Sequence, residues 1–290
     1  MNNTTNKPTN EELSILIDKA TEGDKDALKT IIMSVKDLIF NLSLRTLGTF
    51  PDAEDASQDI ILKVITHLSS FKKESAFSTW VFSIAINHLK DYKKHMFAKY
   101  PLSFEFYKED ILNAPVNDVP DLTQNVEKDI LSEELKLSCT NVMLQCLDTE
   151  SRCIFILGTM FKPDSRIAGD ILGITPEAYR QRLSRIRKKM ADFLEAYCGE
   201  YGTGKCKCRN RLNYAIQSHR LNPVSLEYTG AVEIPMETIL NFKAAMEEID
   251  DLSLRFSFCK AYQSTDKIKK FIEDFLNSEQ ISIIKGEDVQ

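Results

Sequence analysis

The stretch from Asp164 to Glu195 constrains the fold most strongly, because it contains two helical patterns separated by a turn. The first pattern ends at Gly173, a residue that tolerates the positive φ angle a tight turn needs. Thr175 is the expected N-cap of the second helix, with Pro176 in the first helical position and Glu177 near the positive end of the helix dipole. The sequence therefore predicts a helix-turn-helix.

The second helix of this motif is expected to be amphipathic and strongly basic. Its predicted buried face consists of Tyr179, Leu183, Ile186, Met190, Phe193 and Leu194. Its basic residues, expected toward solvent, are Arg180, Arg182, Arg185, Arg187, Lys188 and Lys189. A helix that enters the DNA major groove with its first turn and neutralises phosphates further along needs this layout. The alternative is an ordinary surface helix with a solvated basic face.

Length and composition indicate a soluble protein of two or three domains, since 290 residues exceed the needs of one small core. No apolar run approaches the roughly 20 residues of a membrane span, and the first residues are polar, so a cytoplasmic location without membrane contact is expected. Seven cysteines in such a chain indicate reduced thiols or a metal site. The sequence contains no P-loop, G-x-S-x-G or H-E-x-x-H motif, so we do not expect an enzyme.

The net charge of −6 does not argue against nucleic-acid binding once it is assigned along the chain. Residues 224–290 contain 13 acidic and 7 basic residues, so this tail accounts for the whole net charge. Local clustering, rather than total charge, governs contacts with phosphates.

Two further segments precede the helix-turn-helix. After a disordered arm over residues 1–10 and core helices from Glu11, the segment from Pro51 to Phe71 predicts a helix with an acidic face. This face consists of Asp52, Glu54, Asp55, Gln58 and Asp59. It could receive a basic partner helix, although a solvated helix start explains the same residues.

The next segment combines aromatic residues with lysines. It contains Phe71, Lys72, Lys73, Phe77, Ser78, Thr79, Trp80, Asn87, Lys90, Lys93 and Lys94. This mixture suits single-stranded nucleic acid, because bases stack on aromatic rings while lysines neutralise phosphates. A core tryptophan followed by a solvated basic helix end is the alternative.

Together these segments resemble the bacterial extracytoplasmic-function (ECF, group 4) sigma factors, which are promoter-specificity subunits of RNA polymerase, over about residues 11–196. PDAEDASQDIILKV is similar to the family's core-polymerase-binding helix, and FSTWVFSIAINHLKDYKK to its promoter-melting segment. The helix-turn-helix is similar to the domain that reads the upstream promoter element. The resemblance implies an all-α fold, core RNA polymerase and promoter DNA as partners, and a separate anti-sigma factor or self-inhibition by a C-terminal extension.

The resemblance also implies a role for each segment. The acidic face would bind core polymerase, and the loop from Ser69 to Thr79 would receive a flipped base of the downstream promoter element. The upstream element would be contacted by Thr175, Pro176, Glu177, Arg180, Gln181, Arg182, Ser184 and Arg185. Of these, Arg182 and Arg185 would contact the DNA backbone.

Two regions connect or follow these domains. Residues 97–128 contain three prolines and many acidic residues and are interpreted as a linker. Cys198, Cys206, Cys208 and His219 follow the basic helix and supply enough ligands for zinc. Nearby arginines would lower the pKa of these thiols, which also favours a redox site. Plain reduced thiols in a small structural cluster remain the alternative, and no cofactor is required.

The expected architecture is therefore all-α, with two helical domains joined by a linker and followed by a small helical extension. Its parts are the arm (1–10), a polymerase-binding and promoter-melting domain (11–96), the linker (97–128), the helix-turn-helix domain (129–197), the cysteine-containing segment (198–223) and an acidic helical extension (224–290). The predicted function is that of an alternative sigma factor. The alternatives are a polymerase-independent helix-turn-helix regulator and a metal or redox sensor with a sigma-like output domain.

Overall fold

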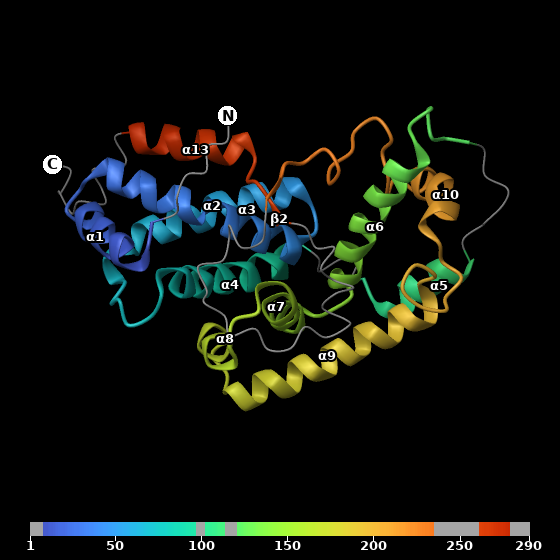
Figure 1. Cartoon of the computed structure of the whole chain (residues 1–290), viewed down its shortest axis with the longest axis horizontal. Helices are drawn as coiled ribbons and strands as arrows, with labels where there is room; N and C mark the ends of the chain where they lie inside the picture. Colours follow the sequence, from blue (N-terminus) through green and yellow to red (C-terminus); the bar gives the residue numbers. More distant parts are fainter. Residues whose placement is uncertain (1–7, 97–101, 114–120, 235–260, 279–290) are drawn as a thin grey trace. The chain divides into compact units, whose positions relative to one another are not determined.

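The computed structural model describes residues 8–96, 102–113, 121–234 and 261–278. Regular structure in these residues is almost entirely helical, which confirms the all-α prediction (Figure 1). The described residues form two compact units, unit 1 from residues 8–92, 234 and 261–278 and unit 2 from residues 93–96, 102–113 and 121–233. None of the helices in these ranges is long and apolar enough to span a membrane.

Unit 1 contains five α-helices and one short 3₁₀ turn within the described ranges. They are α1 (Asn10–Thr21), α2 (Lys25–Leu47), α3 (Phe50–Thr66), η1 (Leu68–Ser70), α4 (Phe77–Met96) and α13 (Asp266–Asn277). The first helix starts one residue earlier than expected because Thr9 and Glu12 form a capping box. Thr49 caps α3, and Asp52 lies in its first turn, where the helix dipole favours an acid.

Helix α2 forms the centre of unit 1. Every residue from Leu38 to Leu47 is buried, so this half of the helix is covered on all sides. A helix that is covered all round normally carries apolar residues throughout. Helix α2 instead includes Asn41 and Arg45, which are only 1% and 0% exposed. Both residues contact the far C-terminal part of the chain.

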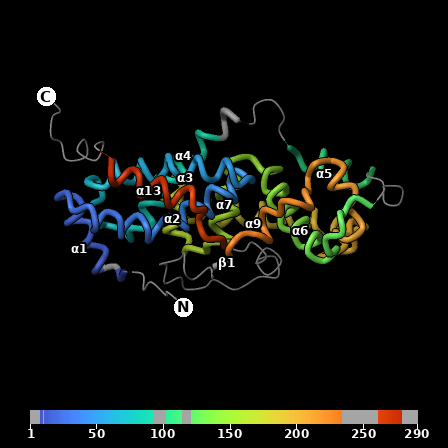
Figure 2. Tube along the Cα trace, turned by 90° about the horizontal axis from the view of Figure 1, so that it is seen from above, coloured from blue at the N-terminus to red at the C-terminus, as the bar shows by residue number. Residues whose placement is uncertain are grey.

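Unit 2 contains the remaining helices. They are α5 (Phe104–Asn113), α6 (Lys128–Gln145), α7 (Thr149–Ile156), the π-helical turn η2 (Leu157–Phe161), α8 (Ser165–Leu172), α9 (Pro176–Tyr197), η3 (Cys208–Arg211) and α10 (Leu212–Gln217). The strands β1 (Glu233–Ile234) and β2 (Ala261–Tyr262) pair in a two-stranded sheet, and Ile234, Ala261 and Tyr262 belong to unit 1. Figure 2 shows the helices of each unit from a second direction.

The domain boundaries differ from those expected at three places. Residues 104–113 of the expected linker form α5, which packs on α9 because Phe104 and Tyr107 both contact the Phe193 ring. The cysteine-containing segment belongs to the same unit as the helix-turn-helix, since Leu212 shares a core cluster with Leu131 of α6. The expected C-terminal extension divides between the units: residues 224–233 belong to unit 2, whereas α13 belongs to unit 1.

Two buried charged side chains hold unit 2 together. Glu134 of α6 accepts hydrogen bonds from the backbone N–H groups of Glu227, Tyr228 and Thr229 at 2.7 to 3.1 Å. Arg152 of α7 donates to the carbonyl oxygens of Leu144 and Leu147, both at 2.6 Å. It thereby ties α7 to backbone carbonyl groups at and just beyond the end of α6.

Candidate functional sites

The helix-turn-helix forms as the sequence predicts. Asp164 caps α8 through its Oδ1, which accepts from the backbone N–H groups of Arg166 and Ile167 at 2.8 and 3.1 Å. Gly173 ends the helix with a φ of 69°. Thr175 then caps α9, because its Oγ1 accepts from the backbone N–H of Ala178 at 3.2 Å. Acid and hydroxyl caps at these two positions set the start of both helices.

The two faces of α9 also match the prediction. Its buried residues are Tyr179, Leu183, Ile186, Met190, Phe193 and Leu194. Of the residues predicted to meet the upstream element, Pro176 is half-buried and the others are exposed, namely Thr175, Glu177, Arg180, Gln181, Arg182, Ser184 and Arg185. Gly158 permits this packing, since a Cβ there would lie only 2.3 Å from a Leu183 methyl carbon.

Several arginines of α9 are already held by neighbouring protein groups. Arg180 donates to Ser165 Oγ at 2.8 Å and to Glu177 Oε1 at 3.1 Å, and Arg182 pairs with Glu150. These contacts orient the two guanidinium groups while leaving them about half exposed. Arg187 differs from the expectation of a solvent-facing residue: it is half-buried, and its Nη2 donates to the Gly158 carbonyl at 2.7 Å.

The predicted acidic face lies on α3, but its members have different surroundings. Asp52 accepts from the Thr49 hydroxyl at 2.5 Å, and Asp59 Oδ2 lies 3.7 Å from His88 Nε2 of α4. Glu54 and Asp55 instead pair with Lys267 of α13, at 3.3 and 2.9 Å from its Nζ. Gln58 lines a shallow pocket together with α13 residues. The sequence offered no signal for the contacts with α13, because more than 200 residues separate Lys267 from Asp55.

The aromatic and basic segment forms a cluster at the start of α4. The ring centroids of Phe71, Phe77 and Trp80 lie 5.4 to 5.6 Å from one another. Lys72 and Asn87 are exposed and Lys90 is half-buried, while the side chains of Lys93 and Lys94 lie outside the described residues. Lys73 pairs with Asp18 of α1 at 2.5 Å. The side chains of Ser78 and Thr79 are buried, unlike that of Lys72.

The cysteine loop folds back on the end of α9. The backbone N–H of Gly199 donates to the Cys206 carbonyl at 2.8 Å, and the N–H of Cys206 donates to the Tyr197 carbonyl at 3.2 Å. Gly204 is required by this close approach, because a Cβ there would lie 1.9 Å from the Tyr197 carbonyl carbon. The glycines of the loop therefore allow it to pack directly against the last turn of the helix.

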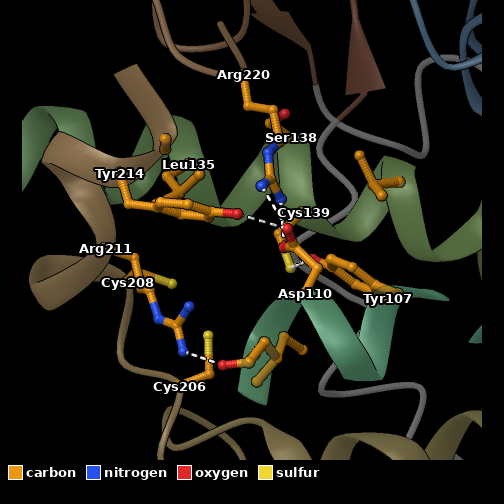
Figure 3. A pocket seen from close by; sticks show the side chains of 13 residues that line it. Tyr107, Asp110, Leu135, Ser138, Cys139, Cys206, Cys208, Arg211, Tyr214 and Arg220 are labelled. Carbon is orange, nitrogen blue, oxygen red and sulfur yellow. Dashed lines mark hydrogen bonds and ion pairs between the residues drawn. The ribbon is translucent and has the colours of Figure 1, made fainter. Parts of the chain in front are cut away.

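The thiols in this region lie beside a small cavity of unit 2 (Figure 3). The cavity encloses about 60 Å³ and is lined by residues of α5, α6 and the segment after α9. Burial raises the pKa of the Cys139 thiol to about 12, although the Tyr107 hydroxyl 2.7 Å away opposes this shift. Burial also raises the pKa of Cys206 and of Cys208 above the ordinary value of 9.0.

These shifts contradict the expectation that nearby arginines favour thiolates. Arg211 does lower the pKa of Cys206, but burial outweighs it. The arginines are also otherwise engaged: Arg220 forms a two-point ion pair with Asp110, and Arg211 donates to the Ile111 carbonyl. Neutral, buried thiols are poor nucleophiles and poor metal ligands.

The predicted metal ligands are not assembled into a site. His219 is exposed in a turn with a φ of 57°, whereas Cys208 is buried. In the part of the chain that the structure describes, no three His, Cys, Asp or Glu side chains are grouped to hold a metal ion. A zinc site at Cys198, Cys206, Cys208 and His219 stays a prediction; in the structure Cys198 and Cys206 are half-buried and Cys208 is buried.

Comparison with known proteins relates both units to one family. Residues 31–95 match the sigma-70 region 2 family, and this range runs from α2 through α4. The chain is 28% identical over 186 residues to the ECF RNA polymerase sigma factor SigW of Bacillus subtilis (strain 168), covering 61% of this chain and 96% of that protein. It is 28% identical over 121 residues to the ECF RNA polymerase sigma-E factor of Haemophilus influenzae, covering 42% and 63%.

Two other similarities cover parts of the chain. The RNA polymerase sigma-H factor of Pseudomonas aeruginosa is 31% identical over 84 residues, which are 29% of this chain and 44% of that protein. A solved structure, CnrH in complex with the cytosolic domain of CnrY, aligns with a TM-score of 0.44 at 21% identity, covering 62% of this chain and 95% of that one. The chain thus contains a region that matches sigma-70 region 2, and it is similar to an ECF RNA polymerase sigma factor over almost the whole length of SigW.

Proposed function

We propose that the chain acts as an alternative sigma factor that binds core RNA polymerase, recognises and melts specific promoters, and directs transcription initiation. The observation that carries the proposal is the arrangement of α9. Its six predicted apolar residues are all buried, while the residues assigned to the upstream promoter element lie on the exposed side of the first three turns. This is the layout with which a recognition helix enters the major groove.

Unit 1 supplies the features that a polymerase-independent regulator does not need. The acidic turn of α3 offers carboxylates to a basic partner surface, and the Phe71, Phe77 and Trp80 rings form an aromatic cluster beside exposed Lys72. Aromatic faces can stack on unpaired bases, and a lysine beside them adds attraction to phosphate. We assign α3 to core polymerase and the start of α4 to the melted promoter strand.

The proposal is tested by transcription in vitro with purified core polymerase, the full chain and genomic DNA fragments. Transcripts whose start sites share an upstream motif are expected only when core polymerase and the chain are both present. If the chain binds the same fragments without core polymerase and yields no transcript, it is a polymerase-independent regulator instead. Addition and removal of zinc and thiol reductant in the same assay would expose a metal or redox sensor.

A further inference from the structure

A segment near the C-terminus, residues 261–278, lies on α2 and α3 of unit 1 (Figures 1 and 2). Its helix, α13, buries Ile268, Ile272 and Leu276 along one face. Ile268 and Ile272 are 0% and 1% exposed, as in a folded core. The segment therefore docks on unit 1 through a specific apolar stripe rather than by charge alone.

The part of α2 beneath this segment is polar. Asn41 exchanges two hydrogen bonds with the Tyr262 backbone, donating to its carbonyl at 2.7 Å and accepting from its N–H at 2.8 Å. Asp37 accepts from the Ser264 N–H at 2.8 Å, and the Arg45 guanidinium lies 5.6 Å from the centre of the Tyr262 ring. Asp37, Asn41 and Arg45 follow one another at four-residue spacing and so form a polar stripe on α2.

This polar stripe makes departure of the segment feasible. If residues 261–278 moved away, Asp37 and Asn41 would exchange protein hydrogen bonds for water and the Arg45 guanidinium would be hydrated, so this part of the interface costs far less to open than the apolar stripe of α13. A purely apolar α2 face would instead make the segment an inseparable part of the core. The polar part of the interface is therefore compatible with reversible dissociation of residues 261–278.

The segment also contacts the face assigned to core polymerase. Lys267 Nζ lies 2.9 Å from Asp55 Oδ1 and 3.3 Å from Glu54 Oε2, and the hydrogen bonds that Lys267 donates to these carboxylates raise its pKa. Phe271 and Phe275 of α13 line a shallow pocket with Gln58. Three of the five residues predicted to bind core polymerase thus adjoin α13.

We propose that the α2 and α3 face is a docking surface shared by two occupants, the chain's own residues 261–278 and core RNA polymerase. Docking of the segment pairs Glu54 and Asp55 with Lys267 and places α13 beside Gln58, so core polymerase binds only the fraction of molecules in which the segment has left. The apparent affinity for core polymerase is lowered in proportion to that fraction. It is about tenfold weaker if the segment is docked nine-tenths of the time. This inference rests on the proposed assignment of α3 to core polymerase.

The test measures binding of core polymerase to the full chain and to three full-length variants. Lys267→Glu places like charges beside Glu54 and Asp55, which should favour release of the segment. Because an exposed ion pair changes an equilibrium by about twofold to fivefold, binding of core polymerase should tighten by that factor. Ile268→Asp removes the buried anchor and should tighten binding by about tenfold. Lys269→Glu, the matched control, makes the same charge change at an exposed position of α13 and should leave affinity unchanged.

Hydrogen exchange of residues 266–277, with and without core polymerase, supplies a second measurement. Exchange in α13 should accelerate when core polymerase binds and should already be fast in free Ile268→Asp. Unchanged protection of α13 in the complex, or equal affinity of Lys267→Glu and Lys269→Glu, would overturn the shared surface while leaving the sigma-factor proposal intact. If no variant forms a complex with core polymerase, the assignment of α3 itself is wrong, and the inference fails with it.

Discussion

Asp110 of α5 and Arg220, which follows α10, form a two-point ion pair in unit 2. Arg220 Nη1 donates to Asp110 Oδ2 at 2.7 Å, and Nη2 donates to Oδ1 at 2.8 Å. The Tyr214 hydroxyl adds a third hydrogen bond to Oδ1 at 2.7 Å (Figure 3). The pair fastens α5, which lies in a region expected to be a linker, to the segment that follows the recognition helix.

We expect Asp110→Asn to destabilise unit 2 by about 1–3 kcal/mol, because Arg220 and Tyr214 lose a charged acceptor. Burial opposes ionisation of Asp110, but hydrogen bonds from Arg220 and Tyr214 outweigh burial and lower its pKa below the ordinary 3.8. The contribution is therefore complete above pH 3.8 and is lost as pH falls through the lowered value. Urea denaturation followed by circular dichroism over a pH series measures it. A stability difference from Asp110→Asn that grows in acid would contradict this sign.

The buried thiols should react slowly. Alkylation requires thiolate, and a pKa one unit higher leaves about one tenth as much of it. We expect Cys139, Cys206 and Cys208 to be modified by iodoacetamide at neutral pH at least tenfold more slowly, by order of magnitude, in the folded chain than in guanidinium-unfolded chain. Peptide mass spectrometry resolves each site. Rapid alkylation of Cys206 in the folded chain would restore the redox interpretation.

Local patterns in the sequence were sufficient to predict the helix-turn-helix. Its caps, Asp164 and Thr175, act on backbone groups within three residues, and its buried face follows helical spacing. The same rules identified the acidic face of α3. Such features depend on neighbours along the chain, so they can be inferred without knowing the fold.

Other parts depended on contacts between distant residues. The pKa of Cys206 is governed by burial, which its arginine-rich sequence surroundings do not reveal. Acidic residues and prolines indicated a linker over residues 97–128. Residues 104–113 instead form α5, whose Phe104 and Tyr107 pack on Phe193. In the helical extension expected over residues 224–290, residues 266–277 form helix α13, Tyr262 is in a strand, and residues 235–260 and 279–290 lie outside the described residues.

Reversal of one charge on α3 tests polymerase binding without disturbing Lys267. Asp59 is exposed and its Oδ2 lies 3.7 Å from His88 Nε2, whereas Lys267 pairs with Glu54 and Asp55. Asp59→Arg should weaken assembly with core polymerase by about fivefold or more if the partner surface is basic. Glu22→Arg, a reversal at the exposed C-cap of α1, is the matched control. Equal affinities of the two variants would argue against a role for Asp59 in docking.

Two variants of the recognition helix, α9, should distinguish contacts with bases from contacts with phosphates. Arg180 lies in the second turn of α9, held by Ser165 and Glu177, whereas Lys188 is exposed three turns from the start. Arg180→Ala should cost about 1–3 kcal/mol at one base pair of the upstream element and relax preference there. Lys188→Ala should weaken binding to every sequence alike and lower the dependence on salt by about one phosphate contact.

Both variants are measured with holoenzyme on a panel of single-base promoter substitutions at several salt concentrations. Because the Arg180 guanidinium is already oriented by Ser165, Ser165→Ala should produce a weaker form of the Arg180→Ala pattern: a small loss at the same base pair and little change in salt dependence. If Arg180→Ala lowered affinity equally at every base pair, Arg180 would contact the DNA backbone rather than a base. Base readout would then be expected from Gln181 or Ser184, which are exposed on the same helix.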